Sequence, residues 1–151
     1  MKTIIVDTNI IFSALLNSSG TIGDLIFNST PVFEFYSCDY MRYEIHKHWA
    51  KLLKISKLPD TDLQNAYEKL LTKIMFINEA LISKEIWLHA EQTVQDIDLD
   101  DTDFVALTNH MNGCLWTGDK DLNNGLKRKK FPCVYNTTEM VSERDKLMTV
   151  L

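Results

Sequence analysis

The sequence predicts an α/β protein in which a central parallel β-sheet is flanked by helices on both faces. Short runs of β-branched and aromatic residues, typical of buried strands, alternate along the chain with longer amphipathic segments that are typical of helices. The 151 residues contain no internal repeat, low-complexity stretch or linker. This length fits one domain of the usual ~100–150 residues, so we expect a single domain over residues 1–151.

The first strand and the helix after it are predicted from local residue types. Thr3–Val6 is a short apolar, β-branched run of the kind found inside parallel sheets. Asp7, Thr8 and Asn9 follow it. Because these residue types cap helices, a helix should begin there and end before Asn17. A short helix and a second strand come next, over 21–28 and 33–37.

Apolar periodicity predicts the remaining elements. Further helices are expected over 39–55, 60–74, 84–95, 101–111 and 122–126, with a last one from Thr137 or Thr138 onward. Two more strands are expected over 114–117 and 131–135. In the helix over 39–55, the expected buried stripe consists of Tyr40, Tyr43, Trp49 and Leu53.

The bulk composition is that of an ordinary globular protein, with 45% hydrophobic and 25% charged residues. No apolar run approaches the ~20 residues of a membrane span, and Asp7 interrupts any signal-peptide core. We therefore expect a cytoplasmic protein that does not bind membranes. Cys38, Cys114 and Cys133 are odd in number and lack C-x-x-C spacing, so we expect reduced thiols and no disulfide.

The net charge of −5 arises from one short stretch of the chain. Five acids fall within the eight residues Asp96–Asp103, which contain no Lys or Arg, and the other 16 acids balance the 16 Lys and Arg. This distribution excludes a uniformly acidic coat and a uniformly basic nucleic-acid-binding surface. The stretch is therefore either a solvated loop or part of a site.

Four carboxylates are predicted to meet at the carboxyl edge of the sheet. Asp7 follows the first strand and Asp119 follows the strand over 114–117, and open α/β sheets bind ligands at this edge. Asp98 and Asp101 lie three residues apart at a helix entry, where they can share one face. Such oxygen ligands suit Mg²⁺ or Mn²⁺. Two such ions ~3.5–4 Å apart can activate a water and stabilise the leaving oxygen of a phosphodiester.

Four segments of the chain resemble the motifs of PIN-domain ribonucleases. Ile4–Asn9 resembles their opening strand, and Asp98–Leu107 resembles their third acidic motif. Leu115–Leu122, which contains Thr117-Gly118-Asp119, resembles the fourth. Glu44 occupies the place of the second motif, a Glu on the helix after the second strand. The motifs occur in the right order and span nearly the whole chain.

This resemblance implies a metal-dependent endoribonuclease with Mg²⁺ or Mn²⁺ as its cofactor, often the VapC-like toxin of a toxin–antitoxin pair. The implied partners are an RNA substrate, a small antitoxin protein and a second copy in a homodimer. The catalytic residues carried over are Asp7, Glu44, Asp101 and Asp119, and the metal ligands are Asp7, Asp98, Asp101 and Asp119. Thr8, Asn9 and Thr117 would orient carboxylates or waters.

The third motif leaves its register open, because Asp100, Asp101 and Asp103 could each take the ligand position. We prefer Asp101, since Phe104–Leu107 then falls in the helix register of the family. Asp96, Asp100 and Asp103 are accordingly expected to be surface charge.

Two groups of cations could bind RNA phosphates, although a plain solvated face is the simpler interpretation of each. The candidate RNA-binding residues are Lys47, Lys51 and Lys54, spaced along one predicted helical face, and the run Lys127, Arg128, Lys129 and Lys130. We assign no catalytic role to any histidine. Trp49, Trp87 and Trp116 are expected in the core.

Rival classes fit the sequence less well. A haloacid-dehalogenase-like phosphatase needs a second acid two residues after the first, where this chain has Asn9. A phospho-receiver domain needs a Lys at a late strand end, which Thr117-Gly118-Asp119 does not supply. Two alternatives within the PIN fold stay open: an RNA-maturation nuclease outside any toxin system, and a catalytically silent RNA-binding or scaffold module.

Overall fold

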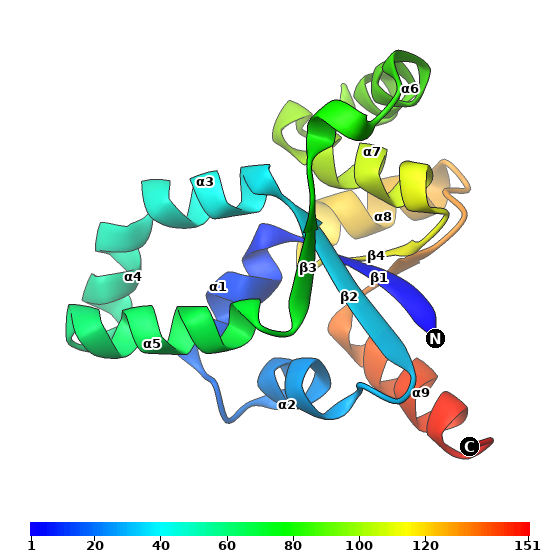
Figure 1. Cartoon of the computed structure of the whole chain (residues 1–151). Helices are drawn as coiled ribbons and strands as arrows, with labels where there is room; N and C mark the ends of the chain where they lie inside the picture. The colour runs from blue at the N-terminus through cyan, green and yellow to red at the C-terminus, as the bar shows by residue number, and fades with distance from the viewer.

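The computed structural model describes all 151 residues and contains a five-stranded, wholly parallel sheet in the order β3-β2-β1-β4-β5 (Figure 1). The strands are β1 (Lys2–Val6), β2 (Phe33–Cys38), β3 (Ile74–Ile77), β4 (Cys114–Trp116) and β5 (Val134–Tyr135). The α-helices are α1 (Thr8–Leu16), α2 (Thr21–Asn28), α3 (Asp39–Lys47), α4 (Trp49–Ser56), α5 (Asp60–Leu71), α6 (Lys84–Val94), α7 (Thr102–Met111), α8 (Lys120–Arg128) and α9 (Thr137–Met148). Two 3-10 helices, η1 (Glu79–Leu81) and η2 (Leu99–Asp101), complete the fold. The predicted α/β class is confirmed.

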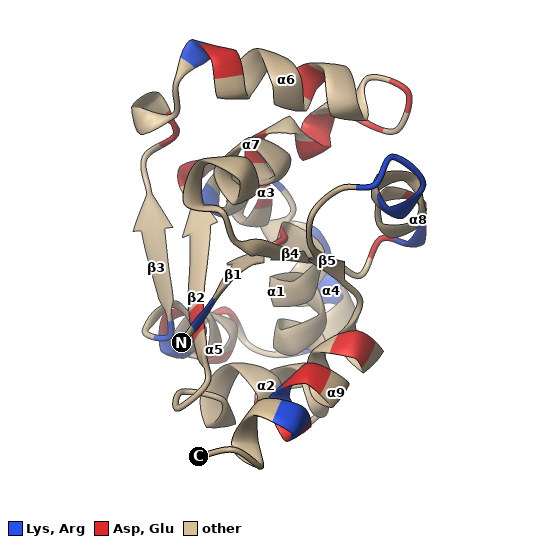
Figure 2. Ribbon diagram, turned by 90° about the vertical axis from the view of Figure 1, so that its right-hand side faces the viewer, with Lys and Arg blue, Asp and Glu red and all other residues tan.

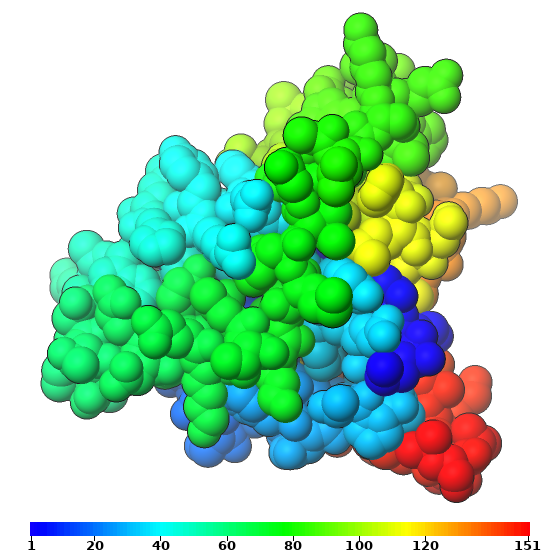
Figure 3. Space-filling view, viewed as in Figure 1, coloured from blue at the N-terminus to red at the C-terminus, as the bar shows by residue number.

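The helices surround the sheet. Figure 1 shows α3, α4 and α5 on one side of the strands and α6, α7 and α8 on the other. In Figure 2, α6 and α7 lie toward the carboxyl ends of the strands, and α2 and α9 lie toward their amino ends. The segment from α3 to α5 forms a lobe at one side of the molecule (Figure 3). No single helix is long and apolar enough to cross a membrane, although α1 and α2 pass that test together as a bent pair.

The centre of the core lies where α7 crosses β1, β2 and β4. Phe104–Leu107 on α7 are fully buried, and so are Ile4, Ile5 and Val6 on β1. Burying each of the Ile, Val, Leu and Phe side chains among them contributes roughly 1.5–3 kcal/mol. Because β1 and the first turns of α7 are anchored so firmly, the polar residues that directly adjoin them have well-defined positions.

The sequence did not predict strand β3. We expected a helix over 60–74, but α5 ends at Leu71 and Ile74–Ile77 pair with β2. The strand was hard to recognise in the sequence because β3 lies at the edge of the sheet. It pairs on one side only, and Met75 is 59% exposed. The segment therefore lacks the continuous buried run by which β1 was recognised.

The helix expected over 39–55 is two helices. It breaks at His48, which ends α3 and precedes α4. The break turns Trp49 toward Tyr67 of α5, whose ring centroid lies 5.8 Å away. The expected buried stripe is correspondingly wrong at Tyr43, which is 58% exposed. Trp49 and Trp87 are partly buried against the core, and Trp116 is fully buried.

The expectation of three reduced thiols is contradicted by a disulfide between Cys114 and Cys133. Cys114 begins β4, and Cys133 directly precedes β5 on the neighbouring strand. The Leu115 amide donates to the Cys133 carbonyl, so the parallel pairing of β4 with β5 brings the two cysteines together. Their sequence separation of 19 residues concealed this proximity. Cys38 is free and buried, and burial raises the pKa of its thiol.

Candidate active site

Asp7 occupies the junction between β1 and α1. Its amide donates to the Trp116 carbonyl at 3.1 Å, which extends the β1–β4 pairing by one residue. Its Oδ1 caps α1 by accepting from the Thr8 amide at 2.7 Å. Its Oδ2 accepts from the Thr117 hydroxyl at 2.7 Å and from the Asn9 amide group at 3.4 Å. The carboxylate is therefore fixed in orientation, and the residue is only 5% exposed.

Thr117, Asn9 and Asp119 hold the end of β4 against this junction. The Thr117 hydroxyl, fully buried, accepts from the Asp119 amide at 3.1 Å while it donates to Asp7. Asn9 Oδ1 accepts from the Gly118 amide at 2.9 Å. Asp119 in turn caps α8, since its Oδ1 accepts from the amides of Asp121 and Leu122. The threonine and asparagine thus hydrogen-bond the Asp7 carboxylate, and through the amides of Gly118 and Asp119 they hold the turn that carries Asp119.

Glu44 reaches the same place from α3. Its Oε1 accepts from the Thr8 hydroxyl at 2.5 Å, so Thr8 joins the glutamate to the β1–α1 junction. Burial raises the pKa of Glu44, against the opposing effect of the Thr8 hydrogen bond. The four-residue spacing from Glu44 also brings His48 to this cleft, where its positive charge would lower the pKa of the glutamate.

Asp98 and Asp101 come from the segment around η2, which leads into α7. Asp98 is exposed and caps η2, because its Oδ1 accepts from the Asp100 amide at 2.9 Å. Asp101 is only 9% exposed. Its Oδ2 is buried and has no hydrogen-bond partner. Asp101 is thus the one acid of this stretch with a buried oxygen that lacks a hydrogen bond, and the charges of Asp7, Asp98, Asp119 and Glu44 act on it.

These carboxylates border an open cleft of about 290 Å³. The residues that line it are Asp7, Thr8, Asn9, Phe12, Glu44, His48, Lys51, Asp98, Asp100 and Asp101. Asp119 lines a small neighbouring pocket, yet its charge still acts on Asp7 and Asp101. Sequence reasoning missed Phe12 and His48, for which the only signals were their helical spacings from Thr8 and Glu44.

The electrostatics of the cleft are dominated by burial and by repulsion between like charges. Burial raises the pKa of Asp7 to about 6, although hydrogen bonds from Thr117 and Thr8 oppose the shift. Burial, followed by the charges of Asp7, Asp98, Asp119 and Glu44, raises the pKa of Asp101 to about 8. None of these five acids forms an ion pair with a basic side chain.

This arrangement fits a bound divalent cation. A buried carboxylate oxygen with no donor, among four further acids and no paired base, needs either a proton or a cation. The donors are all hard oxygen atoms, which favour Mg²⁺ or Mn²⁺ over softer metals. The acids that border the cleft or act on its charges, and are therefore the candidates to hold such an ion, are Asp7, Glu44, Asp98, Asp101 and Asp119.

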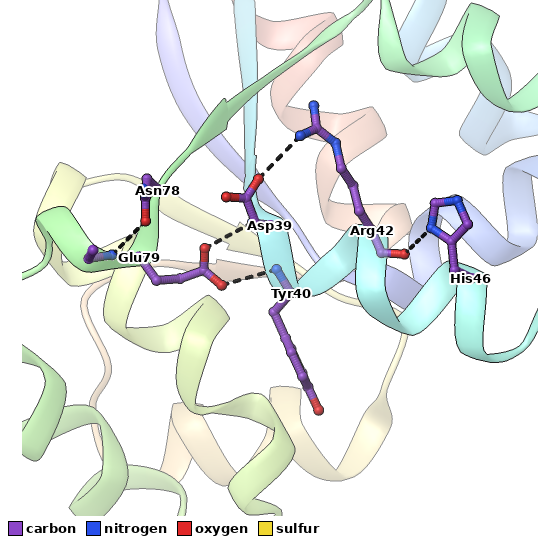
Figure 4. Close-up of polar contacts among 7 residues, drawn as sticks. Asp39, Tyr40, Arg42, His46, Asn78 and Glu79 are labelled. Carbon is purple, nitrogen blue, oxygen red and sulfur yellow. Dashed lines mark hydrogen bonds and ion pairs between the residues drawn. The ribbon is translucent and has the colours of Figure 1, made fainter.

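The acidic stretch divides differently from the expectation at Asp103. Asp96 and Asp100 are both exposed, although Asp100 also lines the cleft, and Asp103 is partly buried beside Glu79 and Cys38. Burial and the Glu79 carboxyl raise the pKa of Asp103 to about 7. Glu79 itself caps α3, since its two oxygens accept from the amides of Asp39 and Tyr40 (Figure 4). Helix capping therefore explains Glu79. Cys38, Glu79 and Asp103 bring ligand atoms within 4.8 Å of one another, and the charge of Glu44 in the cleft also raises the pKa of Asp103.

The candidate RNA-binding cations are scattered. Lys51 lines the cleft, whereas Lys47 and Lys54 do not, because the break at His48 divides the predicted face between two helices. In the run near the end of α8, visible in Figure 2, Lys127 pairs with Glu139 at 2.6 Å and Lys129 pairs with Asp96. Arg128 and Lys130 are exposed.

The chain is thus an α/β domain whose parallel sheet carries a group of carboxylates at the carboxyl ends of its central strands. The family model described as PIN domain matches residues 5–145, and the chain belongs to that family. No curated protein sequence matches the chain significantly.

Two solved structures are similar to this one in fold. The VapBC2 complex of Rickettsia felis, bound to a DNA fragment from its promoter, contains a chain with a TM-score of 0.66 and 13% identity. The match covers 89% of this chain and 98% of that chain. A toxin–antitoxin complex from Klebsiella pneumoniae contains a chain with a TM-score of 0.60 and 17% identity, covering 89% of this chain and 97% of that chain.

Proposed function

We propose that the protein is an endoribonuclease that hydrolyses RNA phosphodiester bonds with a divalent metal ion, Mg²⁺ or Mn²⁺. The observation that carries the proposal is the buried, unpartnered Oδ2 of Asp101 among four other carboxylates. When bound, the metal would supply an activated water and neutralise charge on the phosphate. An acidic cleft repels RNA by itself, so the proposal requires the ion for substrate binding as well as for chemistry.

The chain's own residues have separate roles in this proposal. Asp7, Glu44, Asp98, Asp101 and Asp119 hold the ion. Thr117 and the Thr8 amide fix the Asp7 carboxylate, and the Thr8 hydroxyl fixes Glu44, so the ligands are oriented before the metal binds. Lys51, a cation on the cleft wall, contributes attraction for the substrate phosphate.

The test is cleavage of a structured RNA with Mg²⁺ or Mn²⁺, with and without chelator. We expect activity that requires the metal and falls at least about 100-fold in Asp7→Asn and Asp101→Asn, because each change removes a ligand charge. Asp96→Asn, a surface acid of the same stretch, serves as the matched control and should retain activity. Cleavage that survives chelation, or full activity in both variants, would falsify the proposal.

We further propose that this nuclease is the toxin of a cytoplasmic toxin–antitoxin pair and binds a small antitoxin protein. Support comes from the fold neighbours, which are described as a VapBC2 complex and a toxin–antitoxin complex. Expression in a bacterium should arrest growth, and co-expression of a small protein encoded beside it should relieve the arrest. A chain that cleaves RNA in vitro but never arrests growth would instead be an RNA-maturation nuclease.

A further inference from the structure

Tyr43 is an aromatic residue that the fold leaves mostly exposed to solvent. It lies on α3 directly before Glu44 and is 58% exposed. Its ring stacks on that of Tyr40, with centroids 5.7 Å apart and planes inclined by 21°. Tyr40 is the only aromatic ring that contacts it, and no cation lies over it. The Tyr43 ring therefore packs on Tyr40, and the residue is otherwise largely open to solvent.

Tyr40, which supports this ring, is itself held from several sides. Its ring packs against the buried Phe104 of α7, with centroids 6.2 Å apart. Its hydroxyl donates to Asp100, a cleft-lining residue, at 3.5 Å. Its backbone amide donates to Glu79, and Figure 4 shows its side chain pointing away from that contact. Three rings thus extend outward from the core, from Phe104 to Tyr40 to Tyr43.

The ring ladder adjoins the carboxylate cleft. Tyr43 precedes a cleft residue in sequence, and Tyr40 touches another through its hydroxyl. Farther along the chain, His48 and Lys51 line the same cleft beyond Glu44. The order along α3 and α4 is therefore aromatic pair, metal-site carboxylate, then cation. Tyr40, whose hydroxyl donates to Asp100, therefore joins the Tyr43 ring to the rim of the cleft.

We propose that Tyr43 is a stacking platform for an unpaired RNA base next to the phosphate held at the carboxylates. The inference rests on the proposed nuclease function and deepens it by naming a side chain outside the carboxylate cluster that recognises the RNA. A free aromatic face accepts any base, and only an unpaired base can leave its own stack to use it. The platform therefore selects unpaired segments with little preference for sequence.

The ladder also fits this role mechanically. Binding a base to a mobile ring costs free energy, because the ring must first be ordered. A ring that is already held in one orientation avoids this cost. Tyr43 rests on Tyr40, and Tyr40 is fixed by contacts to Phe104, Asp100 and Glu79. The competing interpretation is an aromatic pair three residues apart that merely supports α3. That interpretation predicts an effect of Tyr43 on stability and none on RNA binding.

The experiment measures binding of a 2′-O-methyl RNA that resists cleavage and carries 2-aminopurine, with the full chain and Mg²⁺. Wild type should quench the 2-aminopurine fluorescence by stacking. Tyr43→Ala should weaken binding about 5- to 150-fold and lose the quenching, the range expected for one stacked base. Tyr43→Trp should restore both. Met75→Ala removes a side chain of equal exposure on β3 and should leave binding unchanged.

Two results would overturn the platform. One is unaltered affinity and quenching in Tyr43→Ala. The other is an equal loss of affinity for a fully paired RNA duplex, since a paired base cannot stack on the ring. Wild-type cleavage of unmodified RNA is measured in parallel. If wild type cleaves RNA while Tyr43→Ala binds normally, only the platform fails; if wild type neither binds nor cleaves RNA, the proposed function fails as well.

Discussion

At the residue scale, the strongest evidence for a metal site is the contrast among the acids of the Asp96–Asp103 stretch. Sequence reasoning placed Asp7 and Asp119 at strand ends, because Asp7 directly follows β1 and Asp119 lies three residues after the end of β4. It could not choose firmly among Asp100, Asp101 and Asp103, since helical register alone separates them. Burial makes the distinction: Asp101 is buried with a free oxygen, Asp100 is exposed, and Asp103 contacts Glu79.

The raised pKa values predict how the stability of the metal-free protein varies with pH. Folding raises the pKa of Asp7 to about 6 and of Asp101 to about 8. The folded state therefore binds these protons more tightly than the unfolded state. Their contribution is most favourable below the unfolded pKa of ~3.9 and is lost as the pH rises toward 8. Thermal unfolding in chelator should give a lower Tm at pH 8 than at pH 5.5.

Asp101→Asn should remove much of this dependence. At pH 8 without metal, we expect the variant to be more stable than wild type by on the order of 1–3 kcal/mol, because it lacks a repelled, buried charge. Denaturant unfolding at both pH values measures the difference. A variant that is less stable than wild type at pH 8 would show that Asp101 is not repelled in the folded protein.

Thr117 tests the orientation of the ligands. Thr117→Val keeps the side-chain shape but removes the hydroxyl that donates to Asp7 and accepts from the Asp119 amide. We expect a loss of about 1–3 kcal/mol of stability and weaker Mn²⁺ binding, measured by calorimetry. Thr108→Val, which removes a buried hydroxyl bonded to the Phe104 carbonyl, is the matched control. If both variants bind Mn²⁺ equally well, Thr117 has no orienting role.

At the element scale, the sequence predicted elements in proportion to how deeply they are buried. β1 and α7 were recognised because Ile4–Val6 and Phe104–Leu107 form dense apolar runs. The edge strand β3 was missed because it is half exposed, and the break at His48 was missed because the apolar period continues across it. The Cys114–Cys133 bond depends on which strands are neighbours, and residue spacing carries no information about that.

The disulfide should stabilise the β4–β5 pair. Closing a loop of 19 residues restricts the unfolded chain by about 3 kcal/mol. Replacing both cysteines by Ala, or adding reductant, should lower the Tm, while Cys38→Ala serves as the comparison without a bond. Alkylation after denaturation should label one thiol without reductant and three with it. Three labelled thiols in the unreduced protein would refute the bond.

At the scale of the whole molecule, the charge of −5 gains a local explanation. The acidic stretch contributes Asp98, Asp100 and Asp101 to the cleft, whereas Asp96 pairs with Lys129 at the surface. Bound divalent ions would reverse the sign of the potential where RNA must approach. The protein therefore needs no broad basic surface, in agreement with the scattered placement of its cations.

Salt dependence should single out Lys51. Lys51→Ala should weaken RNA binding and reduce the slope of log affinity against log salt by ~0.7, the value for one phosphate contact on a single strand. Lys127→Ala removes a cation already paired with Glu139 and away from the cleft, so it should change the slope less. Equal slopes for wild type and Lys51→Ala would exclude a phosphate contact by this lysine.

Calorimetric titration of the metal-free chain with Mn²⁺ tests the central claim most directly, because it detects the ion without relying on activity. We predict saturable binding to wild type that is weakened at least about 100-fold in Asp101→Asn and in Asp7→Asn, and unchanged in Asp96→Asn. Absence of binding to wild type, or equal binding by all four proteins, would contradict the assignment of these carboxylates to a metal centre.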